Sequence, residues 1–260
     1  MRFSKQASVS ALLAVFCLLG TIIHAQDEAP SPYDGPREKL HAYLLIGQSN
    51  MAGRAPFTEA ESGAVEGAYL LNGEDEWEPA KNPLNRHSTI RKGLGMQKMN
   101  PGYGFSKTML KETKGISIGL VVNAKGGTRI EQWKKGTQFY KEAVRRAKVA
   151  QKTGIIRGIL WHQGESNNGN PEGYLDQLKT LVVDLRRDLG VADLPFIAGQ
   201  INSAPAINDQ IAKLPETLPA TGFVSSEGLK ARDRWHFDAV SMKLLGKRYA
   251  EEILRLQAEL

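Results

Sequence analysis

The chain has 260 residues, 24% of them charged and 41% hydrophobic, with a formal net charge of +6. This length fits one domain with a sizeable core. The basic residues are scattered in pairs without accompanying aromatics, which argues against a nucleic-acid partner. The single cysteine, Cys17, lies close to the N-terminus. If that segment is cleaved, no thiol remains for a nucleophile, a disulfide framework or a metal site.

The N-terminal residues 1–25 have the pattern of a secretory signal peptide. Arg2 and Lys5 form a basic start, an apolar run covers residues 11–20, and Ala25 closes a cleavage site. A retained membrane anchor is the alternative, but the run is shorter than the roughly 20 residues that a spanning helix needs. We therefore expect a secreted or periplasmic protein with no stable membrane anchor after cleavage.

Residues 26–40 hold three prolines and are predicted to form a linker, and residues 41–260 to form a single domain. Apolar patterns in that domain predict strands over 41–46, 68–71, 116–122, 155–161, 195–201 and 222–225. They predict helices over 103–113, 139–151, 174–189, 208–214 and 239–257. This alternation is typical of an α/β fold, a three-layer α/β/α sandwich with a mostly parallel central sheet.

Each distinctive loop follows a predicted strand, so the loops can meet at one edge of the sheet, where ligands bind in such folds. The first strand ends at Gly47, and Ser49 follows two residues later. Ser49 is a candidate nucleophile, with a turn or helix-capping serine as the alternative. The spacing is not that of the Gly-x-Ser-x-Gly elbow. The irregular stretch 54–102 is expected to carry binding function.

Asp233 and His236 are separated by two residues just before the last predicted helix. One loop can therefore hold both side chains, with the carboxylate on one imidazole nitrogen and the other nitrogen facing a serine. A surface turn is the alternative. Gly126 and Gly127 follow a buried strand, and their N–H groups could approach an oxyanion closely or belong to an ordinary turn.

The loop from His162 to Asn167 is rich in polar side chains and follows an apolar strand. Such a loop is costly to bury unless its side chains line a site or bond one another. Gln163 could donate to an oxyanion, and Glu165 could orient a histidine. His162 is a weak metal-ligand candidate, because no cluster at metal-ligand spacing accompanies it. We expect neither a metal nor a cofactor.

Together, four blocks resemble the conserved blocks of the SGNH-hydrolase superfamily, namely 47–54, 125–128, 162–166 and 233–237. More narrowly, they resemble its sialate O-acetylesterase and carbohydrate esterase family 6 (acetylxylan esterase) branch. The resemblance covers about residues 40–256. It implies a flavodoxin-like three-layer fold and metal-independent removal of acetyl groups from carbohydrates.

Carried over to this sequence, the resemblance implies Ser49 as nucleophile, His236 as general acid/base and Asp233 as the acid behind it. Glu165 is a rival or helper of Asp233. The oxyanion hole would use the N–H groups of Ser49 and of Gly126 or Gly127, with the side chain of Gln163. We also predict substrate contacts by Gln48, Asn50, Arg54 and Trp235.

The expected function is a secreted serine esterase that removes O-acetyl groups from acetylxylan or a related acetylated carbohydrate through an acetyl-serine intermediate. Three alternatives remain open. They are a sialate O-acetylesterase, a non-catalytic carbohydrate-binding protein on the same scaffold, and a lipase-like esterase for longer acyl chains. The sequence does not determine the oligomeric state.

Overall fold

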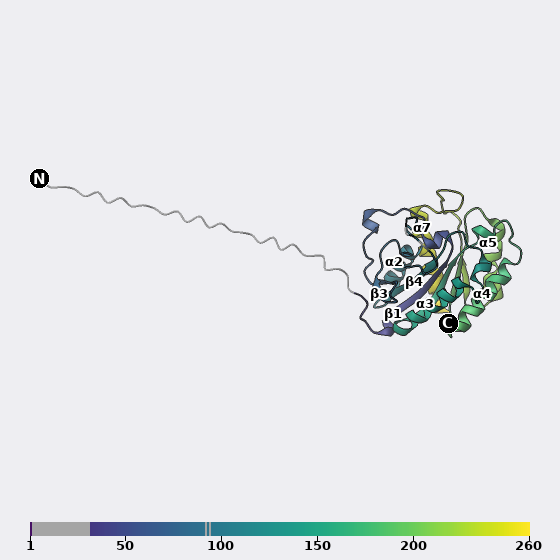
Figure 1. Cartoon of the computed structure of the whole chain (residues 1–260), viewed down its shortest axis with the longest axis horizontal. Coiled ribbons are helices and arrows are strands. Elements are labelled where there is room, and N and C mark those ends of the chain that lie inside the picture. The colour runs from purple at the N-terminus through teal and green to yellow at the C-terminus, as the bar shows by residue number, and fades with distance from the viewer. Residues whose placement is uncertain (2–31, 92, 94) are drawn as a thin grey trace.

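The computed structural model describes Met1 and residues 32–91, 93 and 95–260 (Figure 1). Apart from Met1, the predicted signal peptide lies outside these residues. In the part of the chain that is described, none of the helices is both long enough and apolar enough to cross a membrane.

A seven-stranded sheet forms the centre of the domain, with the strand order β3-β2-β4-β1-β5-β6-β7. The strands are β1 (Leu40–Gly47), β2 (Ala68–Leu71), β3 (Trp77–Pro79), β4 (Ser117–Ala124), β5 (Ile155–His162), β6 (Phe196–Gly199) and β7 (Thr221–Val224). Only β3 runs antiparallel to its neighbour. The central strand β1 is buried along nearly its whole length, as expected for a parallel strand covered on both faces.

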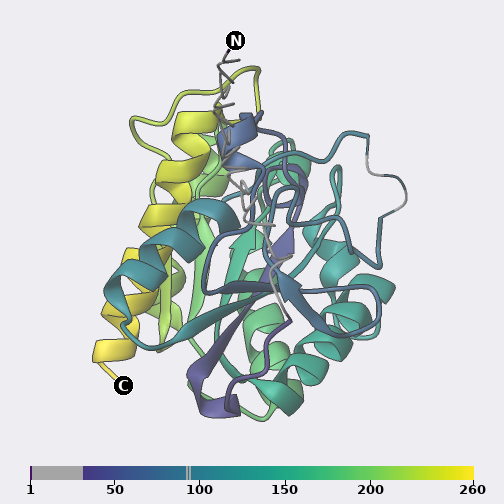
Figure 2. The ribbon, with the colours of Figure 1, turned by 90° about the vertical axis from the view of Figure 1, so that its left-hand side faces the viewer.

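Helices cover both faces of the sheet (Figure 2). The helices are α1 (Ser49–Ala52), α2 (Gly102–Glu112), α3 (Gln138–Thr153), α4 (Tyr174–Leu189), α5 (Pro205–Ala212), α6 (Leu214–Thr217) and α7 (Ala239–Ala258). Four short 3₁₀ turns are η1 (Arg37–Lys39), η2 (Glu59–Glu61), η3 (Ile130–Trp133) and η4 (Glu165–Asn167). Leu44 and Ile46 of β1 pack on the side of α3 and α4, whereas Tyr43 and Leu45 pack on the side of α2 and α7. The predicted three-layer α/β/α fold is therefore confirmed.

Helices α2 and α7 lie side by side and touch through glycines (Figure 2). A Cβ added to Gly104 would lie 2.2 Å from the carbonyl oxygen of Lys243, and one added to Gly246 would lie 2.1 Å from that of Pro101. Larger side chains would force the two backbones apart. This close contact fixes α7, which begins directly after the loop that carries His236.

Three local features differ from the sequence predictions. The described end of the predicted linker packs on the domain, because the ring of Tyr33 lies 5.1 Å from that of Tyr69. Strand β3 was not predicted, since it is short and contains Pro79, which only an edge position tolerates. The predicted helix 208–214 is two helices, of which α5 begins earlier, with Pro205 at its first position.

Candidate active site

The ends of β1, β4 and β5 bring three of the predicted loops to one edge of the sheet. Gly47 at the end of β1 is paired with Ala124 of β4 and with His162 of β5. Gly47 has a φ of 136°, and a Cβ there would lie 2.2 Å from the carbonyl oxygen of His162. A glycine is therefore required where the chain leaves the sheet toward Ser49.

Ser49, His236 and Asp233 form a continuous chain of polar contacts at this edge. The Oγ of Ser49 lies 3.0 Å from Nε2 of His236, and Nδ1 of His236 lies 2.8 Å from Oδ2 of Asp233. Ser49 is the first residue of α1, and the other two side chains lie in the loop before α7. This geometry can transfer the hydroxyl proton to the imidazole while the carboxylate orients the ring.

Hydrogen bonds from its own loop hold the Asp233 carboxylate in place. Its Oδ1 accepts from the backbone N–H groups of Trp235 and His236, at 2.8 and 2.9 Å. Burial acts to raise the pKa of Asp233, but these hydrogen bonds and the adjacent His236 ring outweigh it and lower the pKa to about 2. Asp233 is therefore ionised at neutral pH, and 54% of its side chain is exposed to solvent.

A cavity of about 310 Å³ opens beside Ser49, and Gly126 and Gly127 line it. A Cβ on Gly126 would lie 3.4 Å from the Cβ of Ser49, so the backbone of Gly126 passes close to the nucleophile. Within the described residues, the N–H groups of Ser49, Gly126 and Gly127 donate to no acceptor. Free N–H groups around a reacting hydroxyl can stabilise an oxyanion.

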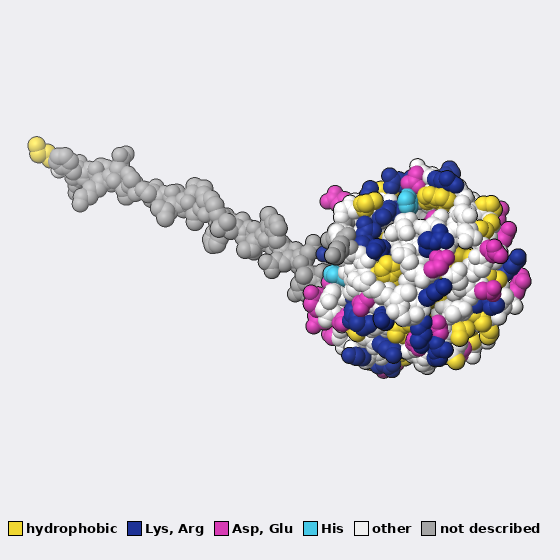
Figure 3. Space-filling model, turned by 45° about the vertical axis from the view of Figure 1, so that its right-hand side comes forward, with side chains coloured by type: hydrophobic (Ala, Val, Ile, Leu, Met, Phe, Trp, Pro, Cys, Tyr) yellow, Lys and Arg dark blue, Asp and Glu magenta, His cyan; other side chains and the backbone are white. Residues whose placement is uncertain are grey.

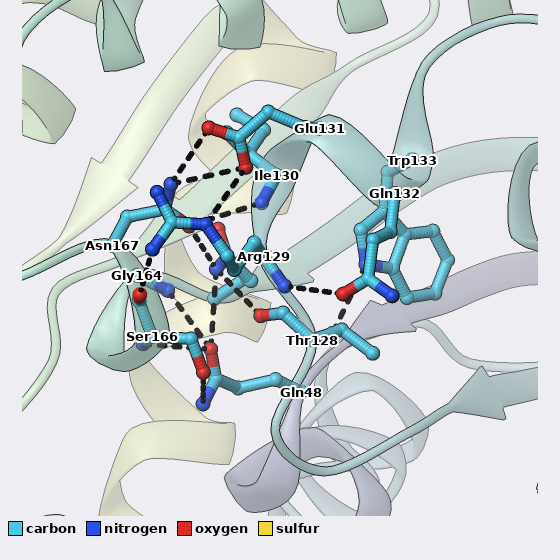
Figure 4. A network of polar contacts seen from close by, with 11 residues as sticks. Gln48, Thr128, Arg129, Ile130, Glu131, Gln132, Trp133, Gly164, Ser166 and Asn167 are labelled. Carbon is cyan, nitrogen blue, oxygen red and sulfur yellow. Dashed lines mark hydrogen bonds and ion pairs between the residues drawn. The ribbon is translucent and has the colours of Figure 1, made fainter. Parts of the chain in front are cut away.

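Gln163 does not face this cavity, which contradicts its predicted place in the oxyanion hole. Its side chain is fully buried, and Nε2 donates to the carbonyl oxygen of Thr128 at 2.9 Å and to Oδ1 of Asn167 at 2.8 Å. Both amide protons are thereby used. Figure 4 shows the surrounding network, in which Gln48, from the loop after β1, bonds to the loop after β5, and Asn167 connects the loop after β5 to the loop after β4.

Glu165 does not contact His236, so its predicted role as the orienting acid does not fit the structure. One of its carboxylate oxygens accepts from Nδ2 of Asn50 at 2.9 Å. Burial raises the pKa of Glu165 to about 7, against the opposing effect of its own N–H and of Asn50. The carboxyl group therefore exchanges between charged and neutral forms near neutral pH.

Asn50 connects Glu165 to the loop that carries the histidine. Its Nδ2 also donates to the carbonyl oxygen of Trp235 at 2.9 Å, and its Oδ1 accepts from the N–H of Phe237 at 3.3 Å. Asn50 is fully buried, so the predicted substrate contact by this residue is wrong. It holds the segment on both sides of His236 instead.

The other predicted substrate residues border the cavity at Ser49. Gln48, Arg54 and Trp235 all line it, and Arg54 is half-buried with Nη1 bonded to the carbonyl oxygen of Met96 at 3.0 Å. The ring of Trp235 lies under the guanidinium of Arg234, at 4.5 Å from its centroid. These three side chains can therefore touch a molecule bound at Ser49.

His162 is a structural residue. It is fully buried, and Nδ1 lies 3.2 Å from the hydroxyl of Tyr249, which itself donates to the carbonyl oxygen of Trp161. Burial lowers the pKa of His162 to about 3, so the ring is neutral. Among the residues that the structure describes, no group of three or more His, Cys, Asp or Glu side chains could hold a metal ion.

Two further residues line the cavity but were not predicted, namely Met96 and Ser166. Met96 lies in the irregular stretch 54–102, where no periodic pattern marks it, and its side chain is largely exposed. Ser166 lies in the sequence block 162–166, but no function was predicted for it. Its carbonyl oxygen accepts from Arg129 at 2.9 Å, which fixes the rim of the cavity.

Two of the known proteins that this chain resembles are named as carbohydrate esterases. A relative in Arabidopsis thaliana, named a probable carbohydrate esterase, is 30% identical over an alignment of 258 positions, which covers 90% of this chain and 97% of the relative. The crystal structure of that Arabidopsis protein matches with a TM-score of 0.74 and 28% identity over 85% of this chain and 99% of the other. A carbohydrate acetylesterase from Xanthomonas citri shares the fold, with a TM-score of 0.63 and 20% identity over 85% of this chain and 57% of the other.

The family model described as "carbohydrate esterase, sialic acid-specific acetylesterase" matches residues 39–255, which is nearly all of the domain. The match does not extend to the narrower acetylxylan esterase branch, which stays a prediction. The chain therefore belongs to the family of sialic acid-specific acetylesterases and is a carbohydrate acetylesterase, a carboxylic ester hydrolase.

Proposed function

We propose that the protein is a secreted serine esterase that removes O-acetyl groups from a glycan through an acetyl-serine intermediate. The observation that carries this proposal is the chain of contacts from Asp233 through His236 to Ser49, at 2.8 and 3.0 Å, beside a cavity bordered by free N–H groups. The signal-peptide pattern of residues 1–25 supports export from the cytoplasm.

In the first step, Nε2 of His236 takes the proton of Ser49 as its Oγ attacks the acetyl carbonyl carbon. In this proposal the N–H groups of Ser49 and of Gly126 or Gly127 donate to the oxygen on which negative charge develops. The ionised Asp233 stabilises the imidazolium that forms. The bond from carbon to the sugar oxygen then breaks, and that oxygen leaves with the proton from His236.

In the second step, water hydrolyses the acetyl-serine. His236 takes a proton from the water molecule, whose oxygen attacks the acetyl carbon. The same N–H groups stabilise the second oxyanion. Acetate leaves and the proton returns to Ser49, so the enzyme is restored without any external oxidant or reductant.

The substrate that we propose is acetylxylan or a related acetylated glycan, with an O-acetylated sialic acid as the alternative. The family description favours the alternative. The four sequence blocks also resemble those of the acetylxylan esterase branch, and this resemblance supports acetylxylan. A panel of acetylated polysaccharides and sialoglycans, with acetate release as the readout, separates the two substrates.

The decisive experiment replaces Ser49 by alanine. We expect Ser49→Ala to lower kcat for 4-nitrophenyl acetate by about 10³-fold or more, because the attacking oxygen is lost. Ser62→Ala is the matched control, since this exposed serine lies away from the cavity. Undiminished acetate release by Ser49→Ala would refute the serine mechanism. A preference for octanoate esters over acetate esters would instead favour a lipase-like esterase for longer acyl chains.

A further inference from the structure

A second cavity, of about 480 Å³, adjoins the one at Ser49. The two share Arg54 and Gly126 among their lining residues. The second cavity is also lined by Arg91 and Lys125 and by uncharged side chains, and no carboxylate is among its lining residues. It is therefore a basic cavity that opens directly from the reaction site.

The three cations of this cavity have no acidic partner within the described residues. Arg54 donates to the carbonyl oxygens of Gly53 and Met96, and Arg91 donates to that of Gly93. The ammonium of Lys125 lies over the ring of Phe139, 5.1 Å from its centroid. These contacts position the side chains but do not neutralise their charge.

Some basic side chains elsewhere on the described chain are paired with carboxylates. Figure 3 shows a face on which Lys and Arg side chains are mixed with Asp and Glu side chains. Arg145 contacts Asp75 and Glu142, and Lys135 contacts Asp188. Surface pairs of this kind keep local charge balanced. The basic cavity lacks such compensation, although all three of its cations are partly buried.

Partly buried cations that line the same cavity are unfavourable without a counter-charge. Burial lowers the pKa of Arg54, and the nearby charge of Arg91 lowers it further. Burial also lowers the pKa of Arg91. An anion between the two guanidinium groups would offset both effects. A planar guanidinium is also well matched to a carboxylate, with which it can form two parallel hydrogen bonds.

We propose that Arg54, Arg91 and Lys125 form a subsite for a carboxylate carried by the acetylated sugar substrate. The proposal rests on the proposed function, and it assigns the substrate to the acidic glycans. Gly126 lies between the subsite and the nucleophile, and because it has no side chain it does not block the path between them. A Cβ at this position would lie 2.9 Å from Nη2 of Arg54 and 3.4 Å from the Cβ of Ser49. One sugar can therefore reach Ser49 with its acetyl group and Arg54 with its carboxylate.

The carboxylate has two possible sources. It belongs either to the acetylated sugar itself or to a neighbouring acidic sugar of the same glycan. An O-acetylated sialic acid and its carboxyl methyl ester test the first source. Acetylated xylo-oligosaccharides with and without a glucuronic acid branch test the second. In both pairs, acetate release is measured, and the two members differ in one negative charge.

We expect the charged member of one pair to have a kcat/KM about 10- to 100-fold higher, chiefly through a lower KM, because charge-assisted hydrogen bonds are lost in the neutral member. The pair that shows the preference identifies the source of the carboxylate. Added salt should weaken the preference, since the subsite is partly exposed.

Variants assign the effect to the cavity. Arg91→Gln and Lys125→Gln should each lower the ratio of kcat/KM between the charged and neutral members by about tenfold. Lys152→Gln is the matched control, because this exposed lysine lies at the end of α3 and lines neither cavity. If Arg91→Gln does not fold, calorimetric binding of glucuronate to Ser49→Ala with and without Lys125→Gln provides the same comparison.

Failure of this proposal is distinguishable from failure of the proposed function. Hydrolysis of 4-nitrophenyl acetate that depends on Ser49, together with equal kcat/KM for both members of both pairs, overturns the subsite alone. A charge preference that survives both Arg91→Gln and Lys125→Gln overturns it as well. Hydrolysis that does not require Ser49 refutes the proposed function, whereas glucuronate binding that is lost in Lys125→Gln still supports the subsite.

Discussion

Two polar loops meet at Ser49, and they differ mainly in burial. At the end of β5 and in the loop that follows it, His162 and Gln163 are fully buried and Glu165 is 7% exposed. In the loop before α7, 54% of the Asp233 side chain and 24% of the His236 side chain are exposed. The buried loop must satisfy its polar groups internally, so it becomes a scaffold. The exposed loop keeps a histidine free to exchange protons with a ligand.

Asn50 joins these two loops. It follows Ser49 in the chain and is fully buried. Its side chain forms hydrogen bonds with Glu165 on one side and with the backbone on either side of His236 on the other. The position of the base therefore depends on the buried loop, although no side chain of that loop contacts the His236 ring. We therefore expect substitutions in the exposed loop to reduce catalysis strongly and substitutions in the buried loop to act mainly on stability.

The largest expected effect separates the two carboxylates. Asp233→Asn should lower kcat by about 10³-fold, because the His236 ring loses the charge that orients it and stabilises its protonated form. Glu165→Gln should lower kcat by about tenfold or less, since the amide oxygen can still accept from Asn50. Steady-state hydrolysis of 4-nitrophenyl acetate measures both variants.

A larger loss of kcat in Glu165→Gln than in Asp233→Asn would contradict this prediction. If Glu165→Gln lost far more activity than Asp233→Asn, Glu165 would be the acid that supports His236 during turnover. Thermal unfolding of each variant excludes simple misfolding as the cause.

A smaller effect is expected from the connection between the loops. Asn50→Ala removes one hydrogen bond from each of three groups, namely the Glu165 carboxylate, the Trp235 carbonyl and the Phe237 N–H. Each costs about 1–3 kcal/mol, so we expect a loss of about 3 kcal/mol in the free energy of unfolding and a drop in kcat of roughly 10-fold. Urea denaturation and ester hydrolysis measure the two effects.

Asn202→Ala is the matched control. Asn202 donates to the carbonyl oxygen of Arg234 in the same loop, at 2.8 Å, but this contact is exposed to solvent. Water can replace it, so we expect a change of about 0.5 kcal/mol or less. Equal destabilisation by the two variants would show that burial does not separate the two contacts.

The sequence predicted most of the sheet and its helices because their apolar patterns are strong. Strand β1 is a continuous apolar run, and α4 carries leucines on one side. The short edge strand β3 was missed because Trp77–Pro79 is short and has no such pattern, although its partner β2 lies only a few residues earlier in the chain. The start of α5 was missed by three residues, although Pro205 marks it.

The candidate site was predicted in part. Spacing alone was enough to suggest that Asp233 and His236 share one loop, and their distances to each other and to Ser49 agree with that. The orientation of the Gln163 side chain could not be predicted from spacing. A polar side chain after a strand can face a cavity or bond its neighbours, and only the positions of Thr128 and Asn167 decide between the two. Arg91 and Met96 lie in an irregular stretch that carries no pattern.

The effect expected to be smallest on catalysis concerns stability and pH. Burial raises the pKa of Glu165 from 4.5 to about 7. Between these values the unfolded chain has lost this proton while the folded chain retains it. The group therefore lowers the free energy of unfolding as pH rises through this window, by about 3 kcal/mol in total. Below pH 4.5 both states are protonated, and the group has no such effect.

Glu165→Gln removes this titration. The free energy of unfolding of the variant, minus that of the wild type, should therefore increase by about 3 kcal/mol between about pH 4.5 and about pH 8, as measured by urea denaturation. Groups that both proteins share cancel in this difference. Glu112→Gln on α2, where 48% of the side chain is exposed, is the surface control. A difference that stays flat with pH for Glu165→Gln would mean that the loop after β5 opens to water, and the distinction between this buried loop and the exposed loop before α7 would then fail.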